Sequence, residues 1–214
     1  MSLTLIGKKR GMTRLFDKKT GKITPCTVIE VAPNVVTQIK TPETDGYTAL
    51  QLASIPLSSA DKGRAKKPIL GDFAAKNLEP RKVRRESRLD NVSEYTVGQE
   101  LEVSLFKEGD LVDVRGNRKG RGYQGVIKRY RKSRIVKSHG AGVVVRHIGS
   151  VGSLRAHGRV QKNKKMAGHM GPELFCVECL RVLGVDPEKK ALIVKGSVPG
   201  ANGGLVYIRG SIKG

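Results

Sequence analysis

The sequence predicts a mainly β protein: a small β-barrel, discontinuous in sequence, with a small partly helical excursion and a long basic extended loop. Three observations lead to this prediction. Short β-branched runs bounded by Pro, Asn and Gly recur along much of the 214-residue chain. Pro and Gly interrupt this pattern between residues 56 and 91. From residue 114 to residue 172 the chain contains no Asp or Glu, and strand-like runs resume after it.

The strand predictions rest on β-branched runs that end at turn residues. Turn signals at Asp186-Pro187 and at residues 199–203 separate the last three runs. Because runs of this length lie on both sides of the basic segment, we expect one barrel built from two parts of the chain. The predicted strands are residues 23–33, 35–40, 47–54, 99–106, 111–116, 174–186, 189–198 and 204–212.

These patterns divide the chain into five parts. Residues 1–55 are expected to form the first part of the barrel, and residues 56–94 the partly helical excursion. Residues 95–114 are expected to supply further barrel strands. A basic, Gly-rich extension then spans residues 115–171, and residues 172–214 complete the barrel.

The excursion contains a helix candidate around Leu70 to Leu78. A second cluster of cations follows this candidate, and we expect it to contact the same polyanion as the extension. The cluster comprises Arg81, Lys82, Arg84, Arg85 and Arg88.

Charge indicates the class of partner. The chain has 41 Lys and Arg against 19 Asp and Glu, a formal net charge of +22. Sixteen of these cations, with 11 Gly, lie in the 59 residues 114–172, and the rest of the chain holds 25 cations and all 19 acids. Self-repulsion on this scale favours a polyanionic partner, and we expect nucleic acid. The extension should be loosely structured alone and become ordered on binding.

A membrane is the other polyanion to consider. No apolar run approaches the roughly 20 residues that span a bilayer, and no basic amphipathic helix carries Trp or Phe on its apolar face. The start "MSLTLIGKKRGMTRLF" lacks the apolar region of a secretion signal. We therefore expect a cytoplasmic protein.

Metal and cofactor sites have little support in the sequence. Cys176 and Cys179 have CxxC spacing but no second pair, so Cys26 and these two are expected to be buried strand cysteines in a reducing compartment. The four His lie 8, 10 and 12 residues apart, which matches no ligand spacing. We expect no metal and no cofactor.

Nucleotide binding is also disfavoured. The segment "GNRKGRGY" lacks the Lys-[Ser/Thr] ending of a phosphate-binding loop. Gly120 to Gly125 fits GxGxxG, but no apolar strand precedes it and no acid follows at the required distance. No nucleophile and base are paired in the sequence, so we expect no enzyme activity.

Two alternatives remain. Charge alone would also suit a DNA-architectural protein, although no helix-turn-helix, zinc finger or basic zipper is visible. An RNA-modifying enzyme would need a cofactor pocket, for which no loop is a candidate. A thin, Gly-rich chain is best suited to insertion into folded RNA, where its cations neutralise phosphates.

The candidate RNA-binding residues are cations, the His residues among them, and glycines that let backbone approach phosphate. They are Lys8, Lys9, Arg10, Arg14, Arg81, Lys82, Arg84, Arg85, Arg88, Arg115, Arg118, Lys119, Gly120, Arg121, Gly122, Gly125, Lys128, Arg129, Arg131, Lys132, Arg134, Lys137, His139, Arg146, His147, Arg155, His157, Arg159, Lys162, Lys164 and Lys165.

Several motifs, in order along the whole chain, resemble one family: the bacterial type of large-subunit ribosomal protein number three. "LIGKKRGMTRLF" is similar to its N-terminal signature, and "GRVQKNKKMAGHMG" and "VKGSVPGANGG" to later family stretches. The most diagnostic motif lies in residues 106–129, where Arg118 replaces the usual Ser or Thr. The matching positions there are Asp113, Gly116, Gly120, Arg121, Gly122, Gly125 and Arg129.

The resemblance implies a structural, non-catalytic protein with a translation-protein-type β-barrel, in the ribosome. It implies direct binding to large-subunit rRNA, a role in early assembly, and neighbours that include large-subunit proteins numbers fourteen and nineteen. It implies neither a membrane partner nor a homo-oligomer. Ser153 stands where many relatives have a methylated Gln, so this modification is not expected. The tip, near the peptidyl transferase centre, would comprise Gly149, Ser150, Val151, Gly152, Ser153 and Leu154.

Overall fold

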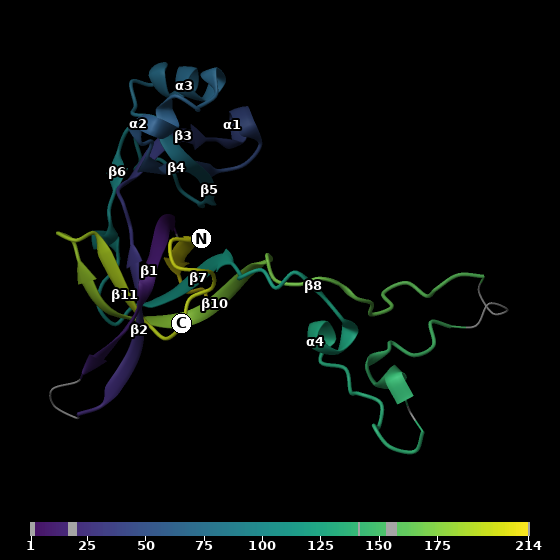
Figure 1. Ribbon diagram of the computed structural model, residues 1–214. Coiled ribbons are helices and arrows are strands. Elements are labelled where there is room, and N and C mark those ends of the chain that lie inside the picture. The colour runs from purple at the N-terminus through teal and green to yellow at the C-terminus, as the bar shows by residue number, and fades with distance from the viewer. Residues whose placement is uncertain (1–2, 17–20, 141, 153–157, 214) are drawn as a thin grey trace. The chain divides into compact units, whose positions relative to one another are not determined.

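The computed structural model describes residues 3–16, 21–140, 142–152 and 158–213. The chain forms two compact units (Figure 1). The globular unit comprises Met1–Asn117 and Leu174–Gly214, and the extension comprises Arg118–Glu173. Residues 115–117, which the sequence assigned to the extension, instead complete a strand of the globular unit.

A closed barrel of six antiparallel strands is the centre of the globular unit (Figure 1). Three of its strands precede the extension and three follow it, which confirms the prediction of a barrel discontinuous in sequence. Alternate residues of each strand point inward. In barrel order the strands are β1 (Thr4–Phe16), β12 (Leu205–Gly210), β7 (Leu111–Asn117), β10 (Leu174–Asp186), β11 (Ala191–Lys195) and β2 (Ile23–Glu30).

A second antiparallel sheet has the order β5 (Arg81–Arg88), β4 (Ala49–Pro56), β3 (Asn34–Lys40) and β6 (Glu100–Leu101). The prediction that residues 35–40 and 47–54 belong to the barrel was therefore wrong. After β2 the chain passes through Ala32-Pro33, and Pro33 has no N–H with which to continue a ladder. The prediction of one strand over residues 99–106 was also wrong. Strand β6 has only two residues, and the 3-10 helix η1 (Val103–Leu105) follows it.

Short helices lie between the strands of this second sheet. They are α1 (Pro42–Asp45), α2 (Ser59–Lys62) and α3 (Lys67–Ala74). The helix predicted around Leu70 to Leu78 corresponds to α3, which begins earlier because Pro68 suits the first helical turn. Phe73 is the buried anchor of α3. The cation cluster of the excursion follows α3 and forms strand β5 at the edge of the sheet.

Strand β1 was not anticipated from the sequence, because its glycines and cations hide the alternation of apolar residues. A Cβ on Gly7 would lie 2.8 Å from Cγ2 of Ile29, so the glycine permits close packing inside the barrel. Near the N-terminal end of β1, side chains of the second sheet form hydrogen bonds with main-chain groups of this strand. Ser87 Oγ accepts from the Thr4 N–H at 2.9 Å, and Asn34 Oδ1 accepts from the Ile6 N–H at 3.0 Å.

The extension contains little regular structure. Its elements are β8 (Tyr123–Gln124), α4 (Val126–Tyr130), the 3-10 helix η2 (Gly142–Arg146) and β9 (Gly168–His169). The segment that follows Gly122 contains the short helix α4. Across the described part of the chain, no helix is both long and apolar enough to cross a membrane.

Candidate nucleic-acid interface

Cations of the globular unit are widely paired with carboxylates. Arg10 Nη2 lies 2.8 Å from Glu30, and Lys40 Nζ lies 3.1 Å from Glu86. Lys213 Nζ lies 2.6 Å from Glu178 on β10. Such pairs contribute little each at an exposed surface, but they cancel the positive field locally. The globular unit therefore resembles an ordinary protein surface in most places.

The extension is different, because its described cations, Arg118 aside, form no ion pair. Its single acid, Glu173, lies at its last position. Where its cations have partners, these include main-chain carbonyls: Arg129 Nη1 donates to Met166 at 3.0 Å, Lys132 Nζ to Ile148 at 2.7 Å, and Lys164 Nζ to Ser150 at 2.9 Å. A carbonyl orients a cation but does not neutralise it. The charge of the extension thus remains uncompensated within the unit.

Two tyrosines give the extension its aromatic surface. Tyr123 is 67% exposed and meets His169 edge-on, with ring centroids 5.7 Å apart. Tyr130 carries Arg129 and Lys165 over its ring, at 5.1 and 5.7 Å from the centroid. Stacked cations of this kind are held in place by the ring while their charge stays available to an anion.

Backbone hydrogen bonds join the two ends of the extension into a neck. Arg118 N donates to Glu173 O at 3.0 Å, and Arg121 N to Met170 O at 2.8 Å. The short ladder of β8 with β9 continues this pairing. Gly171 fits here only as glycine: its φ is +120°, and a Cβ would lie 2.5 Å from the Lys119 oxygen and 2.6 Å from the Gly120 Cα.

Gly171→Ala is expected to open the neck while leaving the globular unit folded. The added carbon overlaps backbone atoms, which cannot move as a flexible side chain can. Amide hydrogen exchange at Arg121 and Met170 should accelerate at least about tenfold, and the exchange of barrel amides should not change.

Gly120→Ala is the matched control, since a Cβ there meets only Pro172 Cδ at 3.8 Å and the φ of Gly120 is not positive. Unchanged exchange at Arg121 and Met170 in the Gly171 variant would show that the neck does not depend on this glycine.

Most predicted RNA-binding residues of the extension lie on its surface. Arg129 is half-buried against Met166, and the others in the described part are exposed. Arg155, His157, Ser153 and Leu154 lie outside the described residues. The exposed predicted residues, the described part of the tip included, are Arg118, Lys119, Gly120, Arg121, Gly122, Gly125, Lys128, Arg131, Lys132, Arg134, Lys137, His139, Arg146, His147, Gly149, Ser150, Val151, Gly152, Arg159, Lys162, Lys164 and Lys165.

Some predicted residues of the globular unit have structural roles instead. Lys9 is 6% exposed, and its Nζ donates to the carbonyls of Val198 and Gly200 at 2.9 and 3.2 Å. The prediction that Lys9 contacts RNA is therefore withdrawn, because its ammonium is committed to the barrel. Lys8 is half-buried in β1, whereas Arg14 is exposed at the far end of that strand.

The cluster on β5 divides in two. Arg81, Lys82 and Arg84 are paired with Glu100, Asp61 and Asp72. Arg85 and Arg88 have no carboxylate partner among the described residues, and each guanidinium lies over a tyrosine ring instead. The five cations lie close together in the sequence, but in the described part of the fold only three of them are paired with carboxylates.

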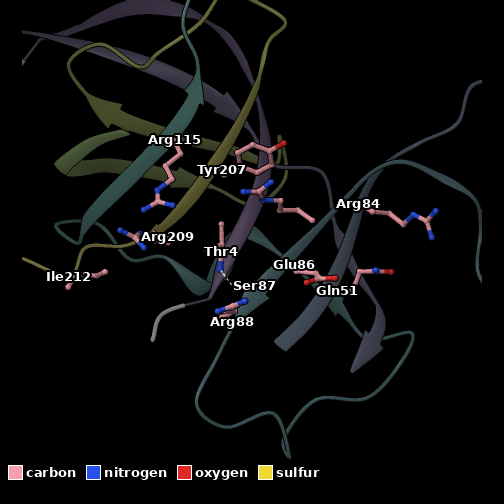
Figure 2. Close-up of a pocket in the computed structure, with 11 residues that line it drawn as sticks. Thr4, Gln51, Arg84, Glu86, Ser87, Arg88, Arg115, Tyr207, Arg209 and Ile212 are labelled. Carbon is pink, nitrogen blue, oxygen red and sulfur yellow. Dashed lines mark hydrogen bonds between the residues drawn. The ribbon is translucent and has the colours of Figure 1, made fainter. Parts of the chain in front are cut away.

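Sequence reasoning missed two residues of this region, Tyr207 and Arg209 on β12. Both line a cavity together with Arg115, Arg85 and Arg88 (Figure 2). The available signal was the alternation in residues 204–212, which places Tyr207 and Arg209 on the same face of the strand. The partner strands could not be identified from that alternation alone.

The cysteines differ from expectation in part. Cys26 is buried, and burial raises the pKa of its thiol, but Cys176 is half-buried and Cys179 is exposed at a bulge of β10. No cluster of three or more His, Cys, Asp or Glu that could hold a metal occurs among the described residues. Asp113, one of the positions that match the family motif, is 2% exposed and paired with Arg209.

Comparisons with known proteins find similarity to one family along nearly the entire chain. The model of a family described as ribosomal protein L3 matches residues 86–178. The chain is 48% identical over 212 residues to the large ribosomal subunit protein uL3 of Protochlamydia amoebophila, covering 97% of this chain and 89% of that protein. It is 46% identical over 213 residues to uL3 of Geobacillus thermodenitrificans, covering 100% of this chain and 98% of that protein.

Proposed function

Because the chain belongs to the ribosomal protein L3 family, a family of structural proteins and not enzymes, we propose that its extension binds large-subunit rRNA directly. The chain itself then serves as a structural constituent of the large ribosomal subunit, within the cytoplasmic ribosome. Its partners are this RNA and neighbouring ribosomal proteins.

The uncompensated charge of the extension carries this proposal. The globular unit pairs many of its cations with carboxylates, whereas the described cations of the extension, Arg118 aside, form no ion pair, and the extension has a single acid at its end. Cations without internal anions gain most from phosphates, whose counterions they release on binding. A chain with this many exposed residues and so little core is completed by packing against RNA.

Neutralising three exposed cations of the extension is expected to weaken binding to large-subunit rRNA. In the variant Arg134→Gln/Lys137→Gln/Arg146→Gln, the slope of log affinity against log salt should decrease in magnitude by about 2 to 3, because each lost phosphate contact removes roughly 0.7 to 0.9. Filter binding at several salt concentrations measures this slope.

A matched control neutralises three cations that have carboxylate partners: Lys76→Gln/Lys189→Gln/Lys213→Gln, paired with Asp72, Asp186 and Glu178. This control has the same net charge as the test variant and should keep most of the wild-type slope. Equal losses in both variants would indicate that net charge alone binds RNA. Equal affinity for duplex DNA would favour the DNA-architectural alternative.

Finer aspects of the proposal concern position and assembly. We place the tip, residues 149–154, near the peptidyl transferase centre, and we propose binding early in subunit assembly beside proteins numbers fourteen and nineteen. Support comes from the family and from the exposure of Val151 at 41%. Crosslinks from a photoreactive residue at Val151 to rRNA distant from that centre would contradict this placement.

A further inference from the structure

We propose that the globular unit holds a second RNA site, an arginine-lined cavity between the barrel and the second sheet that takes phosphodiester groups of the RNA backbone. The cavity has a volume of about 680 Å³, within the range of ligand pockets. RNA as the source of the phosphate rests on the proposed function. The cavity itself rests on side chains of the globular unit alone (Figure 2).

The barrel side of the cavity follows from strand register. Val112, Val114, Val206 and Ile208 are fully buried, so the residues between them on β7 and β12 point away from the barrel interior. Arg115 lies directly opposite Tyr207 in the ladder of these two strands.

Arg209 lies on the same outer face of β12 as Tyr207. It stands opposite Asp113 on β7 and opposite Thr4 on β1. The outer face of three adjacent strands thus presents two arginines and a tyrosine to the cavity.

The second sheet supplies the other wall through β5. Arg85 lies over the Tyr207 ring at 5.1 Å from its centroid, which orients the guanidinium across the cavity. The neighbouring Ser87 accepts the Thr4 N–H at 2.9 Å, as Figure 2 shows by a dashed line. This hydrogen bond fixes β5 against β1, so the two walls are held together without a ligand.

The charges around the cavity are not balanced. Its lining includes five arginines and one carboxylate, Glu86. That carboxylate is already engaged: hydrogen bonds from Tyr47 and Lys40 hold the pKa of Glu86 below its ordinary value. Among the arginines, Arg84 is paired with Asp72 and Arg209 with Asp113.

Three arginines of the lining therefore have no carboxylate partner among the described residues: Arg85, Arg88 and Arg115. Arg115 has a buried Nε without a hydrogen-bond acceptor in the described structure. Three like charges around one cavity repel each other, and an anion relieves this repulsion. The planar fork of arginine matches the oxygens of phosphate, which makes a phosphodiester the best-fitting anion.

The lining also indicates that the RNA backbone enters, and not a base. Tyr207 is the only aromatic residue of the lining, and Arg85 covers its ring. A base would need an open aromatic face or a set of donors and acceptors for its edge. Contacts of this cavity should therefore be independent of sequence, and should position the globular unit on its RNA.

The test uses the full chain with Arg85→Gln/Arg115→Gln. For binding to large-subunit rRNA, the slope of log affinity against log salt should decrease in magnitude by about 1 to 2. The thermal unfolding midpoint is measured on the same variant to show that it is folded. Lys76→Gln/Lys82→Gln is the matched control, since these two cations of the same unit are paired with Asp72 and Asp61 and neither lines the cavity. The control should keep the wild-type slope.

Arg85→Lys/Arg115→Lys guards against a folding artefact, because it keeps the charges while removing the arginine forks. We expect this variant to recover the wild-type slope with about three- to tenfold lower affinity, a loss of roughly 1 kcal/mol. A lysine variant that loses the slope as the glutamine variant does would overturn the charge argument.

The remaining outcomes separate this inference from the proposed function. If the extension triple lowers the slope and Arg85→Gln/Arg115→Gln does not, the cavity is not an RNA site, while the extension still is. If neither variant changes the slope, both proposals fail. A titration with inorganic phosphate alone tests the source of the anion. If phosphate raises the thermal unfolding midpoint of the wild type while Arg85→Gln/Arg115→Gln binds RNA as the wild type does, the cavity takes free anions and the RNA assignment is overturned.

Discussion

Asn34→Ala is expected to lower the free energy of unfolding of the globular unit by about 3 kcal/mol. Asn34 is fully buried, and its amide makes three hydrogen bonds. Oδ1 accepts from the Ile6 N–H at 3.0 Å, and Nδ2 donates to the carbonyls of Ile6 at 3.2 Å and Ala32 at 2.9 Å. Alanine would leave the N–H and the carbonyl of Ile6 without partners inside the protein, and the Ala32 carbonyl would keep only the Ser54 hydroxyl, at 3.4 Å.

The effect is large because Asn34 replaces a missing strand. β2 pairs with β1 from Lys8 onward, so the same edge of β1 at Ile6 has no strand beside it. The side chain of Asn34 satisfies both main-chain groups of Ile6 there, and Ser87 does the same for the Thr4 N–H. These contacts attach the second sheet to the barrel, and they also support the wall of the arginine-lined cavity.

Urea denaturation followed by far-UV circular dichroism measures the loss. Asn202→Ala is the control, because Asn202 is exposed in a turn, and its change should stay within about 0.5 kcal/mol. Asn34→Asp should not restore stability, since a carboxylate cannot donate to the Ile6 and Ala32 carbonyls. A loss below about 1 kcal/mol for Asn34→Ala would show that water replaces the amide at this edge.

The sequence predicted individual strands better than it predicted their sheets. Strand β10 spans residues 174–186, the predicted range, because turn signals bound a largely apolar run. Strands β3 and β4 were recognised but assigned to the barrel, since alternation identifies a half-buried strand without identifying its neighbours. Strand β1 was missed, because inward-facing Lys9 and the glycines interrupt its apolar pattern.

The same limit applied to the candidate sites. The extension could be found from composition, because an acid-free segment of 59 residues is visible without knowledge of the fold. The roles of Lys9 and Arg115 could not be found that way. Lys9 bonds to carbonyls about 190 residues later in the chain. Arg115 lies opposite Tyr207 only when β7 pairs with β12, and it shares a cavity with Arg85 only after the two sheets have packed.

Asp113→Asn is expected to cost about 2 to 3 kcal/mol of stability at neutral pH. Asp113 Oδ2 lies 3.1 Å from Arg209 Nη2, and its Oδ1 accepts the Cys179 N–H at 3.1 Å. Burial alone would raise the pKa of Asp113, but the Cys179 N–H, the Ser211 hydroxyl and Arg209 together hold it below the ordinary value. Asparagine removes the charge that balances Arg209 and weakens the support of the β10 bulge at Cys179.

The pH dependence gives this prediction a second readout. Because the pKa of Asp113 is lower in the folded state, its contribution is fully present above the ordinary pKa of about 3.9 and is lost as pH falls through the folded value. The stability difference between wild type and Asp113→Asn should therefore stay constant from about pH 7 to pH 5 and narrow below about pH 4. Glu178→Gln, which removes the exposed ion pair between Glu178 on β10 and Lys213, should change stability far less, and its effect should not follow the same pH dependence. A difference that persists undiminished at pH 2 would mean that Asp113 stabilises the bulge through packing, and not through its charge.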